Sequence, residues 1–169
     1  IQSEGPYDLV FSSWVLGYIP LDPFFAAAAG SLAPGGRLAF VVHRDGSPRE
    51  PLELFGELVA DDPSVLLRRV DFDFPRDATQ AAARLTAAGL EVVDALEGAI
   101  TFRYDSPTEV LEHLLNSGAG TAYYDAIEPD RRPALERGFL RRLEAAHPGS
   151  ASIEVSHEYV SCIARNTCR

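Results

Sequence analysis

The 169-residue sequence contains no methionine and no lysine, and it has only two cysteines, Cys162 and Cys168. Because methionine is missing even from position 1, we expect the chain to be the C-terminal part of a longer protein; a trimmed complete domain is the alternative. Two cysteines close together near the end are too few for a disulfide framework or a zinc site. No metal site is therefore expected.

Positive charge is also scarce. The 15 basic residues are all arginine and are outnumbered by 25 acidic residues, which gives a net charge of −10. A chain with a net negative charge repels the phosphates of a nucleic acid, so nucleic-acid binding is not expected. No apolar run approaches the roughly 18 to 20 residues that span a bilayer, and no signal peptide is visible. We expect a cytoplasmic protein without a membrane partner.

The first 43 residues have the pattern of a strand, a helix and a strand. Tyr7–Phe11 is a short apolar run that suits a strand buried on both faces of a parallel sheet. Asp22 can cap a helix that begins at Pro23, and Pro34-Gly35-Gly36 is expected to stop it. The apolar run Leu38–Val42 is the second strand. The pattern predicts a right-handed βαβ unit in an α/β sheet.

These residues resemble a known family. Tyr-Asp-Leu-Val, then Ser-Ser-x-x-Leu, a short helix, Leu-x-Pro-Gly-Gly-x-Leu and an apolar strand are similar to the fourth and fifth strands of class I S-adenosylmethionine-dependent methyltransferases. The resemblance implies a partial Rossmann-like sheet, mostly parallel, with an antiparallel last strand and a helical insertion before it. It implies S-adenosylmethionine as cofactor and a small-molecule methyl acceptor. The family's glycine-rich loop and acidic second strand end would lie upstream of Ile1.

Further along the chain, the pattern predicts three regions. Residues 1–104 form the C-terminal half of the methyltransferase core, residues 105–150 form a helical insertion that serves as a substrate lid, and residues 151–169 supply the final antiparallel strand. Ser106-Pro107-Thr108-Glu109 is a capping box that starts the first lid helix. A second lid helix is expected from Pro133 to Ala146.

Four shorter segments carry weaker signals. Helices are expected over Leu52–Val59 and Ala78–Ala88, and Asp71–Pro75 alternates like an extended edge. Glu97-Gly98 indicates a turn or bulge between two strand segments, Leu90–Leu96 and Ala99–Tyr104. The glycines of residues 118–124 predict a flexible linker that ends in two tyrosines.

The resemblance places Ser12, Ser13 and Trp14 beside the methionine part of the cofactor. Small polar residues after a strand allow a ligand to approach closely, although a turn serine is the structural alternative. Gly17 stands where the family often has histidine, which removes one potential base.

Methyl transfer depends mainly on holding the nucleophile and the methyl group close and aligned, so no obligatory triad is expected. His43, just past the second strand, is the candidate base, with a structural strand-end histidine as the more frequent role. Five aromatic residues could line the acceptor pocket, although packing is their more frequent role: Tyr18, Phe102, Tyr104, Tyr123 and Tyr124.

The remaining histidines and the arginine cluster are interpreted as structural. His157 lies within the last strand, and His113 and His147 are expected on helix surfaces. Five arginines could attract an anionic substrate, but a solvated helix face paired with Glu136 and Glu144 is the alternative that we favour: Arg131, Arg132, Arg137, Arg141 and Arg142.

Three functions remain open at this point. The first is S-adenosylmethionine-dependent methyl transfer to a small molecule. The second is a non-catalytic binding or interaction domain that keeps the sheet without the cofactor site, and the third is a nucleotide-binding α/β enzyme such as a reductase.

Overall fold

The computed structural model describes residues 5–118 and 120–168. These residues divide into two compact units, one made of residues 5–45, 71–99 and 158–168 and the other of residues 46–70 and 100–157. The described residues contain a four-stranded sheet in the order β1-β2-β4-β3. Its strands are β1 (Tyr7–Ser13), β2 (Leu32–His43), β3 (Leu90–Tyr104) and β4 (Ile153–Asn166).

The strand directions agree with the predicted fold class. β1 runs parallel to β2, and β4 runs antiparallel to β2. Contacts between Glu91 and Arg165 at one end, and between Arg103 and Glu154 at the other, show that β3 is antiparallel to β4. The prediction of an α/β sheet with a parallel pair and an antiparallel last strand is confirmed.

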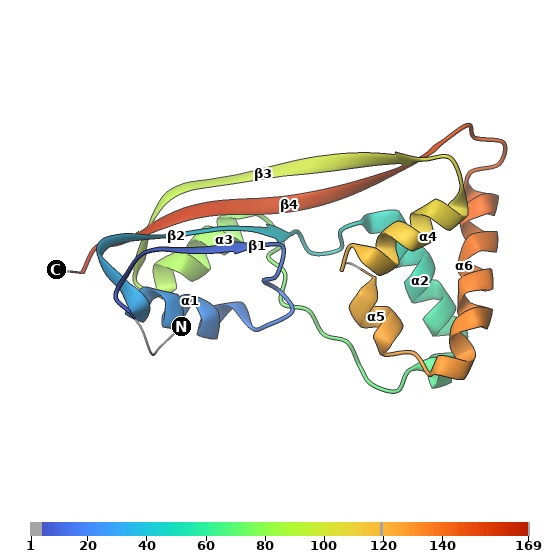
Figure 1. Cartoon of the computed structure of the whole chain (residues 1–169), viewed down its shortest axis with the longest axis horizontal. Coiled ribbons are helices and arrows are strands. Elements are labelled where there is room, and N and C mark those ends of the chain that lie inside the picture. The colour runs from blue at the N-terminus through green and yellow to red at the C-terminus, as the bar shows by residue number, and fades with distance from the viewer. Residues whose placement is uncertain (1–4, 119, 169) are drawn as a thin grey trace. The chain divides into compact units, whose positions relative to one another are not determined.

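The core of the first unit lies between this sheet and two helices, α1 (Leu21–Ser31) and α3 (Ala78–Ala87). Both helices lie on the same face of the sheet (Figure 1). Alternate residues of β2 and β4 point to this face as opposed pairs, and the ring of Phe25 stacks 5.3 Å from that of Phe40. The paired residues are Leu38 with Ala164, Phe40 with Cys162, and Val42 with Val160, and all six are buried.

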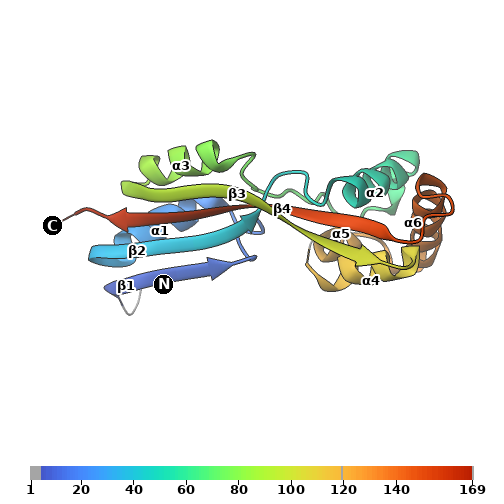
Figure 2. The ribbon, with the colours of Figure 1, turned by 90° about the horizontal axis from the view of Figure 1, so that it is seen from above.

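Among the described residues, β1 is not buried on both faces. β1 is an edge strand, with Leu9 58% and Phe11 66% exposed on the face away from α1. Figure 2 looks onto this face and shows β1, β2 and β4 in front of α1. No helix in the described part of the first unit covers Leu9 or Phe11, because both of its helices pack against the opposite face.

The first helix and the second strand both start earlier than predicted. α1 begins at Leu21 after Pro20, so Asp22 lies inside the first turn and does not cap the helix. β2 already begins at Leu32, so Pro34-Gly35-Gly36 lies within the strand. Close packing explains one of these glycines, because a Cβ at Gly36 would lie 2.7 Å from the backbone oxygen of Tyr7.

Glu97-Gly98 was predicted to be a turn or a bulge, and the chain does not turn there. β3 continues through both residues to Tyr104. Gly98 is instead a close-approach position, since a Cβ there would overlap the hydroxyl end of Tyr159 on the neighbouring strand.

The segment Asp71–Pro75 was expected to be an extended edge, but it belongs to no strand. Its conformation is fixed by Asp73, whose carboxylate accepts hydrogen bonds from the backbone N–H of Leu21 at 2.7 Å and from both terminal nitrogens of Arg84 at 2.6 Å. Arg84 also donates to Asp22 through Nε at 2.6 Å. The bonds from Arg84 lower the pKa of Asp73 below its ordinary value. Asp73 therefore joins the start of α1 to α3.

We expect Asp73→Asn to lower the free energy of unfolding by about 2 kcal/mol, because it replaces two charge-assisted hydrogen bonds by weaker contacts. Asp22→Asn is the matched control, because Asp22 is more exposed and holds Arg84 by one bond, so its loss should stay below about 1 kcal/mol. Since the native pKa of Asp73 is lowered, its contribution should be present at neutral pH and disappear as the pH falls below about 4. Urea unfolding at pH 7 and pH 3 measures both effects, and equal losses for the two variants would contradict this role.

The second unit packs its helices against the parts of β3 and β4 that belong to it. Its core contains Val110, Leu114, Phe139 and Leu143, together with Ile153 and Val155 from β4. The helices are α2 (Arg49–Asp61), η1 (Pro63–Val65), α4 (Pro107–Asn116), α5 (Thr121–Asp125), η2 (Pro129–Arg131) and α6 (Arg132–Ala146).

The start of α4 follows the prediction, and the linker after it does not. Ser106 caps α4 by accepting a hydrogen bond from the N–H of Glu109 at 3.3 Å. Residues 118–124 were expected to be a flexible linker, but the tyrosines lie in the short helix α5. No helix in the described part of the chain is both long and apolar enough to cross a bilayer.

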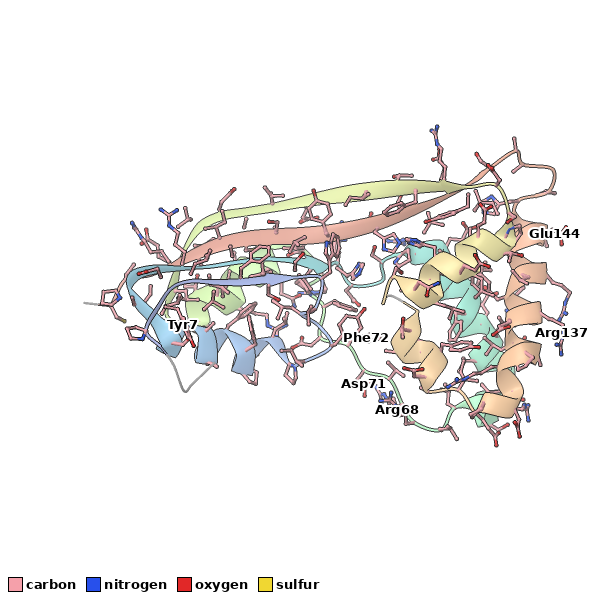
Figure 3. All side chains as sticks on the ribbon, in the orientation of Figure 1. Tyr7, Arg68, Asp71, Phe72, Arg137 and Glu144 are labelled. Carbon is pink, nitrogen blue, oxygen red and sulfur yellow. The ribbon has the colours of Figure 1, made fainter. Side chains whose placement is uncertain are left out.

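The arginine cluster pairs with other partners than those expected. Arg142 contacts Glu57 and Asp61 of α2, and Arg131 contacts Asp62. Glu57 and Asp61 are one helical turn apart, so they present two carboxylates to the same guanidinium. Arg137 and Glu144 are exposed and point from α6 away from the other helices of the unit (Figure 3).

Candidate functional site

The chain leaves β1 through the three residues that were predicted to contact a cofactor. Ser12 and Ser13 end the strand and are half-buried. Within residues 5–118 and 120–168, neither side-chain hydroxyl has a hydrogen-bond partner. Trp14 follows with φ of 59°, an uncommon conformation for a residue with a Cβ, and its N–H donates to Val41 O at 2.9 Å. The turn thus presents two hydroxyls at the carboxyl end of a parallel strand.

His43 ends the neighbouring strand and is 4% exposed. Its ring lies 4.8 Å from that of Trp14 and 5.8 Å from that of Phe74. Burial among these rings lowers the pKa of His43 to about 4, because it disfavours the charged imidazolium. At neutral pH the side chain is neutral, and a group with this pKa is a weak base.

An aromatic cluster lies beside this turn. The ring of Tyr18 lies 5.3 Å from Phe72 and 5.7 Å from Phe74 in edge-on contacts, and burial raises its pKa. Gly17 has φ of +93°, and a Cβ on it would overlap the ring of Phe74. The backbone oxygen of Gly17 accepts from the N–H of Asp73 at 2.9 Å. These contacts fix the loop after β1 against the segment Asp71–Pro75.

Two other predicted substrate residues, Phe102 and Tyr104, lie on β3 in the second unit. Both rings contact His113 of α4, at 4.9 Å and 5.2 Å. The Nε2 atoms of His113 and His157 are 2.7 Å apart and share a hydrogen bond. His113 is half-buried, which lowers its pKa, so the prediction of a surface position is wrong. Val110 and His113 are three residues apart on the inward side of α4, and this spacing could have revealed its burial.

The last two predicted substrate residues have different environments. The hydroxyl of Tyr124 donates to Glu136, and its ring lies beneath Arg132 at 4.6 Å. Tyr123 contacts the ring of Phe55 at 5.7 Å and lines a cavity of about 180 Å³. The substrate-binding role of all five aromatic residues, and the catalytic role of His43, stay predictions.

Sequence reasoning missed the network around Asp73 and the cavity beside Tyr123, because both depend on residues far apart in the chain. Among the described residues, no group of three or more His, Cys, Asp or Glu side chains could hold a metal ion. Cys162 is buried, and burial raises the pKa of its thiol to about 11, so it remains protonated.

No protein-family model matches this chain, and no curated protein does either. Among solved structures, it is similar to a candidate methyltransferase from Bacillus halodurans, with 14% identity over 96% of this chain and 71% of that one, and a TM-score of 0.56. It is also similar to the YcgJ protein of Bacillus subtilis, with 13% identity over 100% of this chain and 68% of that one, and a TM-score of 0.57.

A third similar structure is phosphoethanolamine N-methyltransferase 2 of Haemonchus contortus, in complex with phosphomonomethylethanolamine and S-adenosylhomocysteine. Identity is 15% over 98% of this chain, and the TM-score is 0.43. This chain spans 35% of the length of that enzyme.

The strand order and the first two likenesses define a Rossmann-like α/β protein. Its fold is that of the class I S-adenosylmethionine-dependent methyltransferases, which the sequence resemblance predicts. At these identities the likeness shows the fold alone.

Proposed function

We propose that this chain takes part in S-adenosylmethionine-dependent methyl transfer to a small-molecule acceptor. The observation that carries the proposal is the pair of half-buried hydroxyls, Ser12 and Ser13, at the end of β1. In open α/β sheets, ligands bind outside the carboxyl ends of the parallel strands, which is where these hydroxyls lie.

The chemistry of this turn fits the amino-acid end of the cofactor. A hydroxyl can donate to the carboxylate of that end or accept from its ammonium group, and Ser12 and Ser13 offer two hydroxyls side by side. The rings of Trp14 and His43 contact each other beside the turn, and the N–H of Trp14 donates to Val41 O. When bound, the cofactor supplies a methyl group activated by a positively charged sulfur.

The remaining residues of the turn act by positioning and by excluding water. Tyr18 keeps its proton because burial raises its pKa, so it adds no negative charge beside the turn. His43 is neutral at pH 7, so it adds no positive charge beside a cationic cofactor. In-line methyl transfer needs no obligatory base, and the weak basicity of His43 is compatible with it.

Replacing Ser13 with Leu tests the proposal, because a bulky apolar side chain would fill the space beside Ser12 and remove a hydroxyl. We expect affinity for S-adenosylhomocysteine, measured by calorimetric titration, to fall at least about tenfold, which corresponds to about 1.4 kcal/mol. Thr79→Leu, at an exposed position of α3, is the control and should leave affinity unchanged. Unchanged affinity in Ser13→Leu, with the melting temperature of the unsubstituted protein, would remove the support for this site.

A further inference from the structure

The cavity of about 180 Å³ in the second unit is formed by three segments. Leu52, Phe55, Gly56 and Val59 come from α2, Leu66, Arg69 and Val70 follow η1, and Tyr123 comes from α5. All of them belong to the same compact unit. A smaller cavity of about 20 Å³ adjoins it and shares Leu52, Phe55 and Tyr123.

Backbone hydrogen bonds hold the walls of the cavity. The N–H of Leu67 donates to Ala126 O at 2.8 Å, and the N–H of Glu128 donates to Val65 O at 2.9 Å. The same two segments of the chain also form an isolated antiparallel β-bridge between Leu66 and Ile127. The cavity is therefore a built feature of the unit and not a gap between loose loops.

The lining is apolar except at Arg69 and Tyr123, and Arg69 is its one charged residue among those that the structure describes. A guanidinium at the edge of an apolar cavity attracts a negatively charged ligand, and it does so against the chain's net charge of −10. A guanidinium carries five N–H donors, so it can bind a carboxylate beside its contacts within the protein. Arg68, the preceding residue, is also exposed and adds positive charge to the same segment (Figure 3).

The volume limits the ligand to a small one. An apolar cavity of about 150 Å³ is known to hold one benzene molecule, so this cavity has room for one ring or a short branched chain. We propose that it binds a small apolar carboxylic acid, with the apolar part between α2 and Tyr123 and the carboxylate at Arg69. This binding does not depend on methyl transfer.

Three ligands of the same shape test the charge preference. Benzoate, benzamide and benzamidine share a ring and a planar head group, and they carry a negative, a zero and a positive charge. Protein-observed NMR titration at pH 7 should show benzoate binding at least about tenfold more tightly than benzamidine, with benzamide between them. The shifted resonances should include those of Val59, Leu66 and Tyr123. Equal affinities, or shifts elsewhere, would overturn the proposal.

Two variants separate the contributions of the charge and of the cavity. Arg69→Gln should lower the affinity for benzoate to that for benzamide and leave benzamide within about twofold. Gly56→Leu should abolish binding of both ligands, because a Cβ at Gly56 meets no atom within 4 Å and a longer side chain can extend over the cavity. Gly30→Leu, at an equally open helix position in the first unit, is the control and should bind like the unsubstituted protein.

Two outcomes for these variants would contradict the proposal. If Arg69→Gln weakens benzoate and benzamide to the same extent, the carboxylate does not bind at Arg69 and the proposal is wrong. If Gly56→Leu still binds benzoate with a melting temperature like that of Gly30→Leu, the ligand lies outside the cavity. A failure of S-adenosylhomocysteine binding leaves these results unaffected, because all the lining residues lie in the second unit.

Discussion

Gly17→Ala is expected to lower the free energy of unfolding by about 3 kcal/mol or more. Gly17 adopts φ of +93°, where a side chain is strained, and a new Cβ would overlap the ring of Phe74. The conformational term is about 1 to 2 kcal/mol, and forcing extra volume into a packed site adds about 1 to 3 kcal/mol. Denaturant unfolding monitored by circular dichroism measures the loss.

Gly35→Ala provides the matched control for the conformational term. Gly35 also has a positive φ, of +80°, but a Cβ there meets no atom within 4 Å. Its replacement should therefore show the conformational loss without the overlap. In a double-mutant cycle, combining Gly17→Ala with Phe74→Ala should recover the steric part as a coupling energy. If Gly17→Ala and Gly35→Ala are equally destabilised, Gly17 and Phe74 are not in close contact.

The second large effect is a fall in stability between pH 6.5 and pH 4, caused by His43. The buried imidazole has a pKa of about 4 in the folded protein, against about 6.5 in the unfolded chain. In this range the unfolded chain binds the proton and the folded protein does not, so acid favours unfolding. The stability is fully present above pH 6.5, and about 3 kcal/mol is lost as the pH falls to 4.

His43→Gln should remove most of this pH dependence, because glutamine does not titrate. His113→Gln is the control: burial also lowers the pKa of His113, but that residue is half-buried and lies in the other unit. Urea unfolding between pH 4 and pH 8 compares the slopes. NMR titration of the His43 ring gives its pKa directly, and a value near 6.5 would contradict the burial of this residue.

The sequence predicted the elements whose determinants are local. The apolar run Leu38–Val42 identified the core of β2, and the side chain of Ser106 with Pro107 identified the start of α4 within one residue. The ends of the strands and the structural roles of the glycines were predicted poorly, since they depend on contacts with residues elsewhere in the chain. Gly98 resembles a turn residue in sequence. In the structure a glycine fits there because the side chain of Tyr159 occupies the space that a Cβ would need.

The candidate site was predicted only where residues are neighbours in the chain. Ser12 and Ser13 end β1 and Trp14 follows them, and the contact between His43 and Trp14 was not predicted. Of the five aromatic residues expected in the acceptor pocket, Tyr18 belongs to the first unit and the other four belong to the second. Their spacing in sequence carried no information on this, because the ring of Tyr124 is held by Glu136 and Arg132, whereas Tyr123 lines a cavity.

The order of the strands also determines when the sheet can be completed during synthesis. β4 lies between β2 and β3 in the sheet, yet it is the last of these strands to be made. Until residues 153–166 leave the ribosome, β2 and β3 each have an unpaired backbone edge facing the place of the missing strand. Such edges can pair wrongly with each other or with other chains, and contacts this distant in sequence form slowly. The nascent chain therefore depends on delayed insertion of its central strand.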